Sequence, residues 1–348
     1  MRVWLIDEFG HGGINRYVVD VSRLLEGAST TIIATTDDAS CEDTGAAHEV
    51  WFPRRFGKYA GKAWAAAWGL LSVVSRPQSG DVVWVPLGIR PAYELTLVTL
   101  ARIRGCRVVV TVHNRKPHAR THDSRAVQLA CRLAADVVVH TKALERWAVE
   151  RRVAPTRLPF PQPNLGRQAR REGSVAPKVI TVSLLGYQYA YKGPDILLRA
   201  LARVKSPRIH VVLAGKPAPD LDLPQLAAEL GVLSKVTLDL GFLEQARLAQ
   251  LLDETDIIAL PYRDIDNTGI GASARQRGLP AIASDLPALR ELFGDTAIFV
   301  TPGDDEELGR VLSDLPATYP ELARKAQSLA TDHAGLSEAY HNFSSNWA

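Results

Sequence analysis

The stretch Leu185-Gly-Tyr-Gln-Tyr-Ala-Tyr-Lys192-Gly193-Pro-Asp-Ile-Leu-Leu-Arg-Ala-Leu201 joins an apolar run to an amphipathic segment through a loop with two glycines. The apolar run, Val179–Leu185, predicts a buried strand. Pro194 near the first helical position and Asp195 in the first turn predict a helix over Asp195–Val204. Strand, glycine loop and helix in this order predict one unit of a parallel sheet with helical crossovers.

The same alternation extends along the chain in both directions. Further strands of the second half are predicted at Ile209–Ala214, Val236–Leu240, Ile257–Leu260, Ala281–Ser284 and Ile298–Val300, and another helix at Gln245–Leu252. Strands of the first half are predicted at Val3–Ile6, Thr30–Ala34, Val82–Val85, Val108–Val112 and Val137–Val139. The sequence therefore predicts an α/β protein with two Rossmann-like, doubly wound domains that face a cleft.

A break in the pattern separates the two halves. Residues 158–173 contain three prolines, glycines and several charges without periodicity, so we place an interdomain linker at about 158–176. The expected domains are 1–165 and 166–335, with 336–348 as a C-terminal helix that packs back on the first domain. A chain of 348 residues is long enough for two hydrophobic cores.

Composition excludes several classes of protein. The chain is 46% hydrophobic and 23% charged, as expected of a globular protein, and it contains no run of about 18 apolar residues that would span a membrane. Met1–Asp7 is typical of a first strand and not of a signal peptide, which predicts a cytoplasmic location. Cys41, Cys106 and Cys131 are too few and too dispersed for a disulfide framework or a zinc site.

Charge is distributed unevenly between the halves. Residues 1–170 hold 24 Lys/Arg against 15 Asp/Glu, a net +9, which leaves 17 against 23, a net −6, for the remainder. A basic half can attract nucleic acid, an anionic membrane surface or an anionic acceptor. No RNA- or DNA-binding module accompanies this excess, so nucleic acid is not an expected partner.

Two segments of the second half have the composition of an anion site. Lys192 lies where a point charge would meet a diphosphate, although a Lys-Gly surface turn is the structural alternative. The second segment runs from Tyr262 to Gly278 and begins a glycine-rich helix near Thr268-Gly269. The free N–H groups at such a helix start can hold a diphosphate.

Two segments of the first half are candidates as well. Gly10-His-Gly-Gly13 follows the first strand and precedes a helix, which predicts either a phosphate contact or a plain tight turn. It does not match the dinucleotide-binding pattern, because the third glycine is missing. The strand that ends at His113 leads into Asn-Arg-Lys-Pro-His118-Ala-Arg120, where cations suit a phosphate-bearing ligand or form a solvated loop.

The segments around Lys192 and Tyr262, with Ala214-Gly-Lys216 and Gly241-Phe-Leu-Glu-Gln-Ala-Arg-Leu248 between them, resemble the donor-binding domain of family 4 glycosyltransferases (glycosyl transferases group 1). The resemblance covers most of residues 178–300. In the first half it is limited to Gly12-Gly13 and to the Thr-Val-His-Asn segment that contains His113. It implies the two-domain GT-B fold and a nucleotide-diphosphate sugar bound by the C-terminal domain.

The resemblance also implies roles for individual residues. His113 and Lys192 would be catalytic, His113 lining the reaction centre and Lys192 neutralising the leaving diphosphate. The donor-binding residues would be Gly12, Gly13, Gly186, Tyr191, Gly193, Gly215, Lys216, Tyr262, Asp266, Asn267, Thr268, Gly269 and Ile270. The acceptor side would include Arg115, Lys116, His118 and Arg120.

The implied enzyme is a hexosyltransferase-like glycosyltransferase of bacterial-type envelope or exopolysaccharide synthesis. Its acceptor would be a glycan, a lipid-linked sugar or a small molecule, and retention of the anomeric configuration is favoured over inversion. We find no convincing D-x-D motif, and the resemblance implies a metal-independent reaction without a cofactor, in which cations and helix dipoles stabilise the diphosphate.

Two departures from the family pattern leave alternatives open. A pair of glutamates with seven residues between them is replaced by Ile265 and Ser273, and an arginine before the Lys-Gly pair is replaced by one of Tyr187, Gln188 or Tyr189. A degenerate nucleotide-sugar-binding partner subunit is therefore the main alternative, and a nucleotide-sugar epimerase is a more remote one. Separation of donor binding from donor hydrolysis distinguishes the enzyme from the degenerate subunit.

The segment from Trp51 to Trp68 interleaves aromatic residues with four cations, Arg54, Arg55, Lys58 and Lys62. Trp64 and Trp68 are four residues apart, a spacing typical of ordinary core packing on a helix. The mixture of cations and aromatic rings also suits a peripheral enzyme that rests on an anionic bilayer. Association with the inner face of the membrane is therefore a second hypothesis for this segment.

Overall fold

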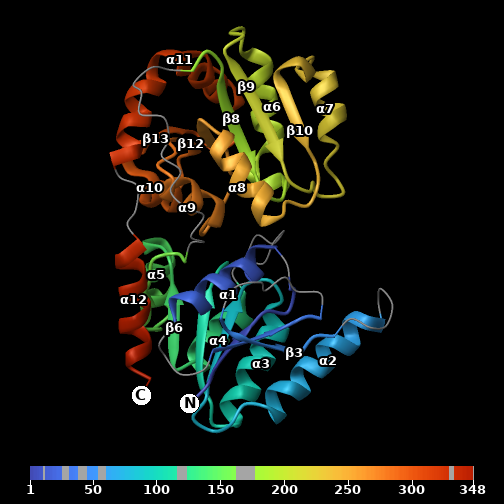
Figure 1. The fold of residues 1–348 in the computed structure, drawn as a ribbon, viewed down its shortest axis with the longest axis vertical. Coiled ribbons are helices and arrows are strands. Elements are labelled where there is room, and N and C mark those ends of the chain that lie inside the picture. Colours follow the sequence, from blue (N-terminus) through green and yellow to red (C-terminus); the bar gives the residue numbers. More distant parts are fainter. Residues whose placement is uncertain are drawn as a thin grey trace. The chain divides into compact units, whose positions relative to one another are not determined.

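The computed structural model describes residues 1–10, 12–25, 31–37, 45–53, 60–115, 124–161, 177–328 and 333–347. The chain divides into two compact units (Figure 1). Unit 1 comprises Met1–Pro163 with Asp332–Ala348, and unit 2 comprises Asn164–Thr331. Of the predicted linker, residues 158–161 pack in unit 1, since Leu158 is buried and its N–H bonds to Val139 O. The other linker residues, 162–176, lie outside the described part.

Unit 1 is built on a parallel sheet. Its described strands are β1 (Val3–Ile6), β2 (Thr31–Thr35), β3 (Ala47–Val50), β4 (Val82–Leu87), β5 (Arg107–Val112), β6 (Asp136–Val139) and β7 (Pro155–Arg157). They lie in the order β3-β2-β1-β4-β5-β6-β7. Its helices are α1 (Gly12–Leu24), α2 (Ala60–Ser75), α3 (Pro91–Ile103), α4 (Arg125–Leu133), α5 (Lys142–Glu150) and α12 (His333–Ser345).

Alternation along β1 explains the layers of unit 1. Successive side chains of a strand point to opposite faces. Trp4 and Ile6 join the core beneath α2, α3, α4 and α5, whereas Val3 and Leu5 join the core beneath α1 and α12. In that second core Tyr340 of α12 stacks on Trp84 with ring centres 6.5 Å apart. The last helix of the chain therefore belongs to unit 1.

Unit 2 repeats this architecture. Its strands are β8 (Ile180–Leu185), β9 (Ile209–Ala214), β10 (Val236–Asp239), β11 (Ile257–Leu260), β12 (Ala281–Ser284) and β13 (Ala297–Val300), all parallel, in the order β10-β9-β8-β11-β12-β13. Its α-helices are α6 (Pro194–Arg203), α7 (Leu223–Glu229), α8 (Gln245–Glu254), α9 (Gly269–Gln276), α10 (Pro287–Phe293) and α11 (Asp305–Ser328). Short 3₁₀ turns are η1 (Ala190–Lys192), η2 (Leu233–Lys235) and η3 (Gly294–Thr296). The core contacts place α6, α7 and α11 on one face of the sheet and α8, α9 and α10 on the other.

The strands predicted from apolar runs are all present, with ends that differ by two residues at most. Two further strands, β3 and β7, lie at the edges of the unit 1 sheet and had no apolar run to reveal them. His48 and Glu49 of β3 and Thr156 and Arg157 of β7 are half-exposed or exposed. An edge strand buries little surface, so its sequence carries a weak signal.

Candidate donor site and a polar network in unit 1

The order of the unit 2 strands defines where a ligand would bind in that unit. β8 and β11 are neighbours, and the strands that follow each of them extend in opposite directions across the sheet. Ligands of open α/β sheets bind at such a reversal point, outside the carboxyl ends of the two strands. The loop after β8, residues 186–193, and the loop after β11, residues 261–268, both begin there.

These two loops pack directly against each other. The Arg263 N–H donates to Tyr191 O at 2.7 Å, and the Arg263 guanidinium donates to both oxygens of Asp195 at 3.0 and 2.7 Å. Gly193 has a φ of 68°, and a Cβ added there would lie 2.2 Å from Pro261 O. Only glycine fits this left-handed position against the neighbouring backbone. Arg263 was not among the residues predicted for the site.

Lys192 lies at the junction of the loops. Its Nζ is 5.9 Å from the centre of the buried Tyr262 ring, and a Cβ added to Gly186 would lie 3.3 Å from the same Nζ. Burial lowers the pKa of Lys192 to about 8, because a poorly solvated ammonium group is disfavoured. The amine is therefore charged at neutral pH and incompletely hydrated, which favours an interaction with an anion.

The loop after β11 leads into the start of α9. Thr268 is the N-cap, and its Oγ1 accepts from Gly271 N at 3.2 Å. The first N–H groups of a helix have no acceptor within the helix, so the start at Gly269 and Ile270 suits an anion. Ser273 Oγ, one turn later, donates to Gly269 O at 3.0 Å. Of the other predicted donor residues on this loop, Asp266 is buried and Asn267 is half-buried.

Gln188 also lies at the carboxyl edge of the unit 2 sheet. No role in the site was predicted for it from the sequence. Its side chain is fully buried, and Nε2 donates to Leu184 O, Gly186 O and Ala214 O at 3.2, 2.7 and 3.0 Å. A Cβ added to Gly215 would lie 2.1 Å from Gly186 O, so the ends of β8 and β9 approach closely. Lys216 follows and is exposed.

The predicted residues of the first half lie in unit 1. Gly12 and Gly13 begin α1, and a Cβ added to Gly13 would meet nothing within 4 Å. Arg115, past the end of β5, is half-buried. Lys116, His118 and Arg120 lie outside the described residues.

His113, directly after β5, is buried in an aromatic cluster. Its ring centre is 4.3 Å from that of Tyr17, in an edge-to-face arrangement, and Phe160 and His140 flank it. Burial, and then the neighbouring His140, lower the pKa of His113 to about 3. The imidazole is therefore neutral at physiological pH. This makes His113 a weak candidate for contributing positive charge to a reaction.

His140 is a structural residue. Its Nδ1 lies 3.0 Å from Leu158 O, which can only accept, so Nδ1 carries the proton and Nε2 accepts from the Tyr17 hydroxyl at 3.3 Å. The Tyr17 oxygen in turn accepts from Thr111 Oγ1 at 2.8 Å, and Trp84 Nε1 donates to Thr111 at 2.8 Å. These hydrogen bonds hold α1 against the sheet.

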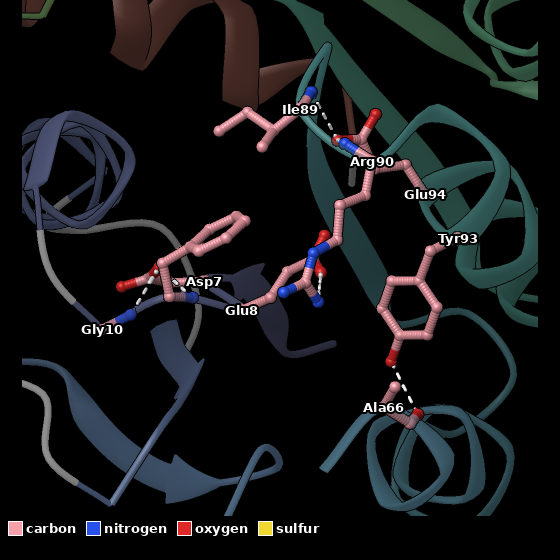
Figure 2. A network of polar contacts seen from close by, with 9 residues as sticks. Asp7, Glu8, Gly10, Ala66, Ile89, Arg90, Tyr93 and Glu94 are labelled. Carbon is pink, nitrogen blue, oxygen red and sulfur yellow. Dashed lines mark hydrogen bonds and ion pairs between the residues drawn. The ribbon is translucent and has the colours of Figure 1, made fainter. Parts of the chain in front are cut away.

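A polar network at the carboxyl edge of unit 1 was not predicted (Figure 2). Arg90 Nη1 donates to Glu8 Oε2 at 3.3 Å, and the Arg90 guanidinium lies 5.0 Å from the centre of the Phe9 ring. Glu94 accepts from the N–H groups of Gly88, Ile89 and Arg90 at 2.8, 2.8 and 2.6 Å.

Burial affects the acids of this network. It raises the pKa of Glu8 to about 8, with Glu94 and Asp7 acting in the same direction and Arg90 opposing them. Among the described residues, no group of three or more His, Cys, Asp or Glu side chains is arranged to hold a metal ion.

Comparisons with known proteins show what the two units resemble. Residues 176–317 match the family model of glycosyl transferases group 1. The structure of Anabaena HepE in complex with UDP and glucose superposes with a TM-score of 0.77 at 18% identity, over 99% of this chain and 100% of HepE. The chain has the GT-B fold, and its residues 176–317 are of the group 1 glycosyltransferase type. WaaG, a glycosyltransferase involved in lipopolysaccharide biosynthesis, also superposes on this GT-B chain, with a TM-score of 0.70 at 15% identity over the full length of both.

Sequence relatives support the same type. D-inositol 3-phosphate glycosyltransferase of Rhodococcus erythropolis is 27% identical over 304 residues, which are 77% of this chain and 67% of that protein. MMP α-(1→4)-mannosyltransferase of Mycolicibacterium hassiacum is 33% identical over 160 residues, 44% of this chain. That second match spans only 38% of the mannosyltransferase, less than half of its length.

Proposed function

We propose that this group 1 glycosyltransferase transfers a sugar from a nucleotide-diphosphate donor, bound at the carboxyl edge of unit 2, to a glycan, lipid-linked or small-molecule acceptor in envelope or exopolysaccharide synthesis. The observation that carries the proposal is the meeting of the two loops at the reversal point of the unit 2 sheet. They bring a poorly hydrated lysine and the start of α9 to the same strand ends.

This arrangement suits a departing diphosphate. As the glycosidic bond to the donor breaks, negative charge develops on the diphosphate oxygens, and a fixed cation and helix N–H groups stabilise that charge. Lys192 would supply the cation. Thr268 would cap α9, so that the first N–H groups of the helix face the phosphates. The proposed reaction needs no metal ion and retains the anomeric configuration.

A thermal-shift panel with UDP-, GDP-, ADP- and TDP-sugars tests this function. At a concentration about 100-fold above Kd, the donor with the matching base should raise the free energy of unfolding of unit 2 by about 2.7 kcal/mol. Its Tm should then rise by several degrees. Assays of sugar release and transfer, run with and without EDTA, should show turnover that the chelator leaves intact. No stabilisation by any donor would refute the proposal. Inhibition by EDTA that magnesium or manganese reverses would refute metal independence alone.

A second candidate is a binding subunit without turnover. Ser273 lies at a position where the family pattern has an acid, and its hydroxyl donates to Gly269 O. Gln188 lies in the segment where the family has an arginine, and its amide donates to the carbonyl groups of Gly186 and Ala214 at the strand ends. Neither side chain supplies the charge expected there. Donor stabilisation without any release of sugar would identify this alternative.

We further propose that α2 rests on an anionic membrane surface. No helix of the described residues is long and apolar enough to cross a bilayer. Trp64, Trp68, Leu71 and Val74 of α2 are 37%, 38%, 54% and 38% exposed, so Trp64 and Trp68 lie at the surface and not in the core that their spacing suggested. The two tryptophan rings stack on each other at 5.6 Å. Lys62 is exposed on the same helix, and Arg54, Arg55 and Lys58 lie just before it in the sequence, outside the described residues.

Vesicle flotation tests the membrane proposal. Vesicles with anionic lipid should capture the protein at low salt and release it as salt rises, because each basic residue near the surface contributes about 1 kcal/mol. Alanine replacement of Arg54, Arg55, Lys58 and Lys62, or of Trp64 and Trp68, should lower capture. Alanine replacement of Ile103 and Val149, which are 75% and 60% exposed on other helices, is the matched control. Equal capture by neutral vesicles, or none by anionic ones, would contradict an anionic surface as partner.

A further inference from the structure

Unit 1 has a reversal point of its own. β1 pairs with β2 on one side and with β4 on the other, and the sheet continues outward from both. The crevice expected of an open α/β sheet therefore lies at the carboxyl ends of β1 and β4. Glu8 follows β1 by two residues, and Arg90 follows β4 by three, so these two side chains come from the two loops that begin at this point.

The loop that carries Arg90 is held rigidly. Glu94, in the first turn of α3, accepts three successive N–H groups from Gly88 to Arg90, which fixes the loop backbone. Gly88 has a φ of 119°, and a Cβ added there would lie 2.7 Å from Asn114 O, in the loop after β5. Glu94 is therefore a positioning residue. Its hydrogen-bonding capacity is used within the chain.

Glu8 differs from Glu94 in this respect. It is 8% exposed, and its hydrogen-bonding partner in the described part of the chain is Arg90, at 3.3 Å. A buried carboxylate is costly unless several good hydrogen bonds compensate it, and one long contact compensates it poorly. Glu94, Arg90, Asp7 and Tyr93 are the titratable groups around it, and burial is the main cause of its raised pKa. Such an incompletely compensated acid is a candidate for contact with a ligand.

Glu8 and Arg90 together can form hydrogen bonds with hydroxyl groups of a ligand. The carboxylate of Glu8 can accept from one hydroxyl group, while the Arg90 guanidinium, whose side chain is 40% exposed, retains N–H groups that can donate to the oxygen of its neighbour. The Phe9 ring beside the guanidinium adds an apolar surface. Adjacent hydroxyl groups on a ring with apolar C–H faces are the defining feature of sugars and cyclitols.

We propose that Glu8 and Arg90 bind the acceptor of the transfer reaction by contacting two neighbouring hydroxyl groups of a sugar or cyclitol ring. The inference rests on the proposed transferase function, for which unit 2 supplies the donor. It makes Glu8 and Arg90 determinants of acceptor specificity. They lie in different loops from the acceptor-side residues proposed from the sequence, Arg115, Lys116, His118 and Arg120.

Saturation-transfer NMR with methyl α-D-mannopyranoside and myo-inositol as probes tests the pair on the full-length protein. At pH 9, where Glu8 is a carboxylate, wild type should bind at least one probe, and Glu8→Gln and Arg90→Ala should weaken that binding about tenfold or more, since each loses a charged hydrogen bond to the ligand. Glu145→Gln is the matched control, because Glu145 forms an ion pair with Arg157 at 3.1 Å in which both side chains are about 40% exposed. Stabilisation by the nucleotide-sugar donor should be the same in all variants.

The pH dependence gives a second readout, which a purely structural role would not change. Glu8 has a pKa of about 8, so its carboxylate forms as pH rises from 7 to 9, and probe affinity of wild type should rise with it. The affinity of Glu8→Gln should stay flat. Unchanged probe binding by Glu8→Gln, or a wild type that binds donor but neither probe, would overturn the inference. A wild type stabilised by no donor would instead overturn the proposed function.

Discussion

Replacement of Lys192 by alanine is expected to lower turnover by about 10²-fold or more, because loss of a group that stabilises transition-state charge costs about 3 kcal/mol or more. The amine lies beside Tyr262, where burial limits its contact with water and lowers its pKa. An anion bound there would therefore stabilise the charged amine. Steady-state kinetics with the donor identified by thermal shift measure the effect. Lys205→Ala, an exposed lysine of the same unit, is the control and should behave as wild type.

The same amine predicts a pH profile. Its pKa is about 8, so Lys192 is charged below that pH and neutral above it. We therefore expect kcat/KM for the donor to fall as pH rises through about 8, and the residual activity of Lys192→Ala to lack this fall. Wild-type activity in Lys192→Ala, or the same alkaline fall in both proteins, would remove Lys192 from the mechanism.

Gly193→Ala is expected to have the second large effect. A Cβ at this position would lie 2.2 Å from Pro261 O and 2.9 Å from Ile196 Cδ1, so the loop after β8 must move away from the loop after β11. Such a clash costs about 1–3 kcal/mol in addition to the strain of a positive φ. Because Lys192 directly precedes this glycine, we expect donor affinity to fall at least about tenfold, in line with the loss of one charged contact.

Gly231→Ala separates strain from the clash. Gly231 has nearly the same backbone angle, a φ of 67° against 68° for Gly193, but a Cβ added to it would meet nothing within 4 Å. Its replacement should cost only the strain, about 1 kcal/mol, and leave donor affinity unchanged. Urea denaturation and donor titration of both variants measure the difference. Equal losses in the two variants would show that the packing of the two loops contributes nothing to the site.

The donor half was the more predictable part of the molecule. Lys192, Gly193, Tyr262 and Thr268 each lie within about ten residues of a strongly apolar strand, and the order of strand, loop and helix is local in sequence. Glycines, a proline at the helix start and an N-cap threonine constrain the backbone at their own positions. The resemblance to a known family then connected two such segments that lie about 75 residues apart.

The helix α2 was harder to interpret, because its sequence is apolar on all sides. Periodicity cannot identify the buried face of such a helix. In the structure Gly61, Ala65 and Gly69 face inward, and a Cβ added to Gly69 would lie 2.3 Å from the side chain of Phe52. Close approach through small residues leaves the larger Trp64 and Trp68 on the outside. The packing partner, and not the helix itself, decides which face is exposed.

The sequence by itself determined the two α/β units, nearly all of their strands and the local form of the loops that carry Lys192 and Thr268, because these depend on residues close together in the chain. The tertiary structure alone decided which strands are neighbours. Glu8 and Arg90 are 82 residues apart and meet because β1 pairs with β4, just as Tyr191 and Arg263 meet because β8 pairs with β11. Strand order depends on how whole crossovers pack, a balance of many weak contacts that no short segment encodes.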